Sequence, residues 1–162
     1  MFRRILILLA CAVVLASCGT AGKLGRADIP FTYEVENMGV GIDGTYVVRI
    51  SCYSRNKVVS SNIIKKNAVH AVIFKGVPAG NGSPAQPAIC KASAMDENPA
   101  FFDSFFESEY LRFINSVSRN SLTCYKISNR EYKTSCVVSV SKNALRKYLE
   151  QNGVARSLSE GF

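Results

Sequence analysis

The sequence has few of the residues from which most enzyme active sites are built. It contains one histidine, His70, and no tryptophan among 162 residues. Neither an HExxH segment nor a pair of histidines at metal-binding spacing occurs. The six cysteines include no CxxC pair, which is the usual signature of a dithiol oxidoreductase. We therefore predict no catalytic residue, no metal and no cofactor.

Length and composition indicate one folded domain. A compact core usually has about 100–200 residues, so a second, cofactor-binding domain does not fit. The chain is 48% hydrophobic and 20% charged, which excludes a disordered or acidic tail. Lys and Arg number 20 against 12 Asp and Glu, a formal net charge of +8. Such a charge would ordinarily suggest an anionic partner such as nucleic acid.

The first 18 residues change that interpretation. Arg3-Arg4 precedes an apolar run over residues 5–16, which is shorter than the ~20 residues of a membrane-spanning helix. The run ends in Leu15-Ala16-Ser17-Cys18. This segment resembles the lipobox of bacterial lipoproteins, in which an aliphatic residue and two small residues precede the first mature cysteine. The resemblance implies cleavage between Ser17 and Cys18 and a covalent lipid, diacylglycerol, on the sulfur of Cys18.

The same resemblance predicts the location of the protein. Two or three acyl chains hold a protein stably on a membrane. Gly19 stands where the inner-membrane retention signal of enteric lipoproteins has Asp, and no acidic cluster follows. We expect an outer-membrane lipoprotein that faces the periplasm. The membrane is an expected partner, and nucleic acid is not. Without residues 1–17 the chain has 18 basic and 12 acidic residues, a charge of +6.

Residues 18–30 lack any apolar period and predict a flexible tether, so the domain is expected over residues 31–162. Alternating or β-branched segments predict strands over 31–35, 45–53 and 71–74 and a hairpin of 122–127 with 132–140. Helical spacing predicts a helix after Asn56 or Ser60, another from Pro99, and a third from Ser141 to a stop at Gly153. This order predicts a single small α+β domain, with a mixed or mainly antiparallel sheet and helices packed on one face.

Residues 76–99 predict a long loop. They contain three glycines and four of the five prolines of the chain, and no apolar period. Long loops in compact domains are functional or mobile. No Lys-Ser/Thr pair completes a phosphate-binding loop there. We expect Pro78, Pro84 and Pro87 to contact a partner.

Four phenylalanines within six residues mark the start of the helix at Pro99. Phe101, Phe102, Phe105 and Phe106 form two i,i+4 pairs. They predict a wedge of the hydrophobic core; an exposed docking patch and a pocket for a small ligand are the alternatives. Tyr110, Phe113, Ile114 and Val117 continue the helical spacing, with a break expected at residues 107–109.

Four cysteines remain after Cys11 is removed and Cys18 is acylated: Cys52, Cys90, Cys124 and Cys136. An exported protein can form disulfides. A hairpin turn near Arg130 would place Cys124 opposite Cys136, so these two are the candidates for a bridge. A shift of one residue in register would separate them, and buried free thiols are the alternative for all four.

These features favour a membrane-anchored, non-enzymatic binding or structural module whose partner is an envelope protein or a cell-wall component. Two alternatives remain. A periplasmic hydrolase would have to use His70 as its base, although the neighbouring residues 68–69 and 71–74 are apolar. A small-ligand-binding lipoprotein would use the phenylalanine cluster.

Overall fold

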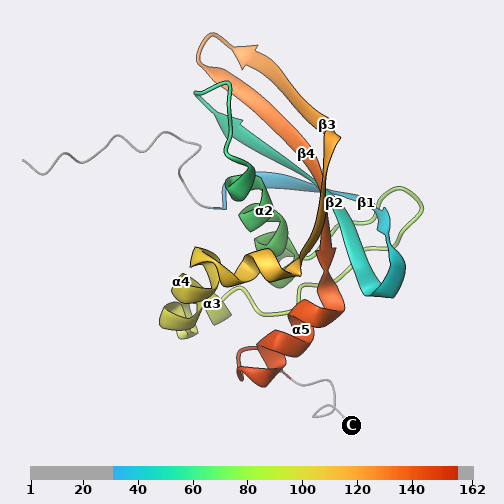
Figure 1. Ribbon diagram of the computed structural model, residues 1–162, viewed down its shortest axis with the longest axis vertical. Coiled ribbons are helices and arrows are strands. Elements are labelled where there is room, and N and C mark those ends of the chain that lie inside the picture. Colours follow the sequence, from blue (N-terminus) through green and yellow to red (C-terminus); the bar gives the residue numbers. More distant parts are fainter. Residues whose placement is uncertain (1–30, 157–162) are drawn as a thin grey trace, which may run out of the picture.

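The computed structural model describes residues 31–156. Its centre is a four-stranded antiparallel sheet in the order β1-β2-β4-β3. The strands are β1 (Tyr33–Val40), β2 (Thr45–Ser54), β3 (Ile114–Ser128) and β4 (Glu131–Ser141). The helices α2 (Ser61–His70), α4 (Pro99–Glu107) and α5 (Lys142–Gln151) cover one face of this sheet (Figure 1). The predicted α+β class, with an antiparallel sheet, is confirmed.

The core lies between the sheet and the helices. Val48 and Ile50 of β2 are paired with Val138 and Cys136 of β4, and all four side chains are buried. Beneath them lie apolar side chains from the three helices: Ile64, Ala68, Phe102, Phe105, Leu145 and Leu149. The predicted core role of the phenylalanine cluster is thus confirmed for Phe102, Phe105 and Phe106, while Phe101 is partly buried.

The opposite face of the sheet is polar. The Ser51 and Ser135 hydroxyls are hydrogen-bonded to each other at 2.7 Å between paired positions of β2 and β4. The carboxylate of Glu34 lies over them, accepting bonds from Lys133 Nζ at 2.7 Å and from the Tyr53 hydroxyl at 2.6 Å. This alternation of apolar and polar faces is what a sheet covered on one side requires.

One predicted strand is wrong. Residues 71–74 continue α2 as a π-helical segment, Ala71–Lys75, which ends at Gly76 with φ 73°. Ser60 caps α2, since its hydroxyl accepts a bond from the Asn62 amide. A short, wholly apolar run fits a buried helix end as well as a buried strand, because neither leaves a polar face. The amide of Gly76 closes the segment on the Ala71 carbonyl at 2.8 Å.

The predicted break at residues 107–109 is confirmed. Helix α4 begins at Pro99 and ends at Glu107, and a 3-10 helix, η4 (Glu109–Phe113), follows. The prediction that helical spacing continues through Ile114 and Val117 is wrong, because both lie in β3. Their apolar side chains pack on the core from the strand, as they would from a helix. At the C-terminus, Gly153 ends α5 with φ 70°, as predicted.

Candidate functional site

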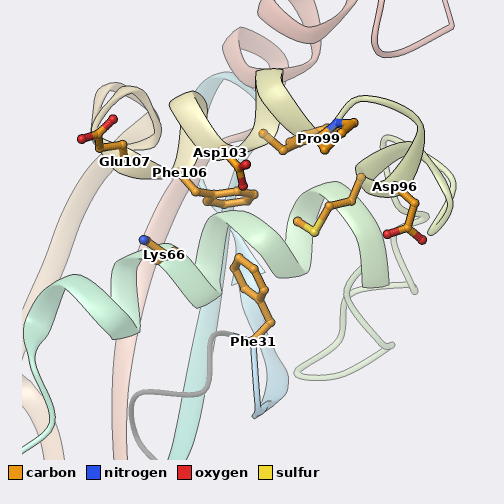
Figure 2. Close-up of a pocket in the computed structure, with 9 residues that line it drawn as sticks. Phe31, Lys66, Asp96, Pro99, Asp103, Phe106 and Glu107 are labelled. Carbon is orange, nitrogen blue, oxygen red and sulfur yellow. The ribbon is translucent and has the colours of Figure 1, made fainter. Parts of the chain in front are cut away.

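A hollow of about 450 Å³ opens between the start of β1 and the helices α2 and α4 (Figure 2). Phe31 closes one side, α2 contributes Lys66, and α4 contributes Phe102 and Phe106. The remaining lining residues come from the short helix α3 (Ala94–Glu97) and from α4: Met95, Asp96, Pro99, Asp103 and Glu107. The end of the proline-rich loop and the phenylalanine cluster therefore meet in one site.

The inner wall of the hollow is aromatic. Phe106 is buried, and its ring lies 5.0 Å from that of Phe31, with the planes inclined at 59°. Phe31 in turn stacks on His70 at 3.8 Å and 18°. Its backbone amide donates to Asn67 Oδ1 at 3.2 Å, which fixes the start of the strand against α2. The wall is therefore held in place by packing on one side and by a buried amide on the other.

The rim of the hollow is charged. Three carboxylates, Asp96, Asp103 and Glu107, and one ammonium group, that of Lys66, line it. Asp103 and Glu107 are exposed and one helical turn apart on α4. Lys66 extends over the ring of Tyr110, 5.6 Å from its centroid. The rim thus has a local charge of −2 on a domain that is basic as a whole.

His70 lies behind this wall, in an aromatic cage. The hydroxyl of Tyr33 bonds to its Nδ1 at 2.7 Å, and the rings of Phe31, Phe74 and Phe106 surround it. Burial, reinforced by the charge of Lys75, lowers the pKa of His70 to about 4. Burial also raises the pKa of the Tyr33 hydroxyl. The imidazole is therefore neutral near pH 7, with Nδ1 occupied by the bond to Tyr33.

The proline-rich loop is ordered against the sheet. Val77 pairs with Gln86 and Gly80 with Ser83, so the loop folds back on itself as a narrow hairpin. Gln86 Oε1 accepts a bond from the Tyr46 hydroxyl at 2.8 Å. Asn37 of β1 donates to the Pro78 carbonyl at 3.1 Å. These bonds hold the loop across β1 and β2.

The three prolines predicted to contact a partner are all exposed. Pro78 and Pro87 line a second hollow of about 460 Å³, together with Val35 and Lys75, whereas Pro84 lies outside it. Little charge surrounds this second hollow. The prolines predicted from the sequence therefore mark an accessible surface. The charged hollow, in which the end of the same loop takes part, was not predicted.

The predicted bridge between Cys124 and Cys136 does not form. Cys124 lies opposite Thr134 in the hairpin, because the chain turns at residues 129–130, where Ser128 pairs with Glu131, and the register shifts between Lys126 and Ser128. Its thiol is exposed and bonds to the Lys57 carbonyl at 3.2 Å, while Cys136 is buried. All four cysteines of the described chain are free thiols; the alternative of buried free thiols holds for Cys52, Cys90 and Cys136 and is wrong for the exposed Cys124. Burial raises the pKa of Cys52, and it raises that of Cys90 to about 11.

The lipobox lies outside the part of the chain that the structure describes, and so do Ser17 and Cys18. Within residues 31–156, no helix is both long and apolar enough to cross a bilayer. Over the same span, no three His, Cys, Asp or Glu side chains are grouped as metal ligands.

Comparison with known proteins returns no match for this chain to a family model, a curated protein or a solved structure.

Proposed function

We propose that this protein is an outer-membrane lipoprotein, facing the periplasm, whose domain binds another envelope component without catalysis. The observation that carries the proposal is the hollow between Phe31, α2 and α4, which combines an aromatic wall with an acidic rim. Among envelope components, a protein segment that carries a basic side chain beside apolar ones fits this arrangement best.

The anchor comes from Leu15-Ala16-Ser17-Cys18. A diacylglycerol on Cys18 would hold the protein on the membrane, and residues 18–30 would span at most about 45 Å at ~3.3 to 3.6 Å per residue. A tethered domain meets its partner at a raised effective concentration, so it can work with modest intrinsic affinity. The tether leads directly to Phe31, which forms a wall of the hollow.

The chemistry of the hollow supports the choice of ligand. Burial of aliphatic or aromatic groups against an apolar wall of phenylalanine, methionine and proline is favourable, and cations are attracted to aromatic faces. Carboxylates at Asp96, Asp103 and Glu107 favour a cationic group and disfavour an anionic one. Lys66 adds one donor that can fix the orientation of a ligand carbonyl.

The environment of His70 supports a function without catalysis. A histidine that acts as a general base needs a pKa near the working pH and a free nitrogen beside the nucleophile. Here the pKa is about 4, and Nδ1 is already hydrogen-bonded to the Tyr33 hydroxyl. The aromatic rings that surround His70 give it the role of a packing residue behind the hollow.

A small-molecule ligand is the second candidate. The hollow, at about 450 Å³, falls within the ~300 to 1,000 Å³ typical of small-molecule sites. Thermal-shift measurements with small organic cations would reveal such a ligand through a rise in melting temperature that Asp103→Asn removes.

The test of the binding site is capture of envelope components by the acylated protein. We expect Asp103→Asn combined with Glu107→Gln to lose most of the bound partner, because two rim charges disappear. Glu36→Gln is the matched control, since Glu36 is a half-exposed carboxylate on β1 that pairs with Arg49 on the sheet instead. Equal capture by both variants would exclude the hollow. Loss on shortening the loop between Pro78 and Pro87 would then assign the contact to the loop.

The test of the anchor is separate. Cys18→Ala should abolish incorporation of labelled fatty acid and release the protein from the membrane fraction. Cys124→Ala is the control, because its thiol is exposed but lies within the folded hairpin. Lipid labelling that survives Cys18→Ala would refute the lipoprotein assignment.

A further inference from the structure

One end of the sheet is basic and partly apolar. It consists of residues 55–58, which follow β2, and residues 124–130, which are the last residues of β3 and the turn that leads to β4; we call it the hairpin end. The two segments touch, since the Cys124 thiol bonds to the Lys57 carbonyl at 3.2 Å, and Figure 1 shows both beyond the helical layer. Four exposed basic residues lie in these segments: Arg55, Lys57, Lys126 and Arg130. The acidic residue Glu131, paired with Ser128, follows them at the start of β4.

Large apolar side chains are exposed among these cations. Val58 is 82% exposed, Tyr125 63% and Ile127 51%. Tyr125 points to the polar face of the sheet, opposite Lys133, whereas Cys124 and Lys126 point to the other face. The apolar and basic groups therefore surround the tip of the hairpin on both faces. Such a mixture of tyrosine, aliphatic and basic side chains suits the headgroup layer of a membrane.

The described chain enters the sheet from this same end. Tyr33, near the start of β1, pairs with Cys52, close to the last residue of β2. Cys52 pairs with Thr134, which pairs with Cys124 at the beginning of the hairpin end. The start of β1 is therefore level with the beginning of the hairpin end, and the opposite end of the sheet, with Ile42 and α5, lies farther along the strands.

We infer that the hairpin end rests on an anionic lipid bilayer, the membrane to which the proposed acyl group on Cys18 attaches the chain. This inference rests on the proposed lipoprotein function and adds an orientation to it. The cations pair with anionic headgroups, while Val58, Tyr125 and Ile127 enter the interfacial layer. Each basic residue near an anionic surface strengthens binding by about fivefold.

The absence of tryptophan permits a direct test, because Tyr125→Trp introduces a single indole. The full acylated variant is reconstituted into vesicles of phosphatidylcholine, with or without phosphatidylglycerol, that contain lipids brominated on their acyl chains. We expect bromine quenching with phosphatidylglycerol, and little without it. Ile42→Trp is the matched control, 84% exposed at the other end of the sheet, and should stay unquenched in both. Adding Arg55→Gln, Lys126→Gln and Arg130→Gln to Tyr125→Trp should lower the ratio of docked to undocked protein by about 100-fold.

Equal quenching at positions 125 and 42, quenching that the three glutamines leave unchanged, or shielding of the indole by cell-wall fragments alone would overturn the inference. Flotation of the same vesicles and mass analysis of Cys18 report the anchor independently. An anchored chain without quenching at position 125 refutes the orientation and leaves the lipoprotein proposal intact. If mass analysis finds no lipid on Cys18 and added anionic vesicles still quench the indole, the lipoprotein proposal is refuted and the contact of the hairpin end with the bilayer stands.

Discussion

The burial of His70 predicts a pH dependence of stability that one residue controls. The pKa of His70 falls from its ordinary value of 6.5 to about 4 in the fold. Between these two values the unfolded chain binds a proton that the folded chain does not, so the free energy of unfolding falls as the pH falls from about 6.5 to about 4. Above this window both states are neutral at this site, and the full contribution is present.

The size of the effect follows from the shift. One pKa unit corresponds to about 1.4 kcal/mol, so the difference between 6.5 and about 4 corresponds to about 3 kcal/mol across the whole window. Most of this loss should occur above pH 5, before the carboxylates become protonated. Glu34, whose pKa the bonds from Lys133 and Tyr53 lower, adds its own loss only below its ordinary value of 4.5.

Urea unfolding followed by circular dichroism, at intervals from pH 7.5 to 4.5, measures the slope. Because the chain has one histidine, its imidazole carbon signals in NMR give the pKa without ambiguity. His70→Gln should be less stable at pH 7.5 and should lose the slope between pH 6.5 and 5. A native His70 pKa near 6.5, or the same slope in His70→Gln, would contradict the burial of His70 in its aromatic cage.

Three further predictions concern the core, the loop and the thiols. Phe102→Ala should lower the free energy of unfolding in urea by about 3 to 5 kcal/mol, because the ring is 2% exposed and leaves a cavity; a loss below 1 kcal/mol would contradict its place in the core. Gly76→Ala should lower the melting temperature, since φ is +73° and the new Cβ would lie 2.5 Å from the Gln86 carbonyl oxygen; an unchanged value would contradict the path of the loop. Cys124 should react with iodoacetamide in the native protein and Cys90 only after unfolding, which peptide mass analysis would show.

Local patterns predicted most of the secondary structure. The β-branched run that became β2, the proline at the start of α4 and the glycine after α5 act through neighbours in the chain, so sequence alone reveals them. The π-helical segment 71–75 could not be predicted in this way. A run that is buried on every side carries no periodicity, and whether it extends a helix or forms a strand depends on the elements packed around it.

The candidate site depended on contacts that no local pattern encodes. Phe31 and Lys66 are 35 residues apart, and only the packing of β1 beside α2 brings both to the hollow. Asp96 and Glu107 are 11 residues apart in the sequence, and no local pattern indicates that both line the same hollow. The cysteine pairing failed for a similar reason, because the position of the turn and the register shift between Lys126 and Ser128 are not apparent in the sequence.

The distribution of charge links the two proposed surfaces. The net charge of +6 beyond residues 1–17 is not uniform: the hairpin end carries four basic groups beside the single acidic residue Glu131 at the start of β4, while the rim of the hollow has a charge of −2. At physiological ionic strength electrostatic fields decay over about 8 Å. A molecule near either surface therefore experiences the charge of that surface and not the net charge of the domain. An anionic bilayer would then attract the hairpin end and repel the rim. A domain turned in this way presents its acidic hollow away from the lipid headgroups, where a basic segment of a partner can reach it.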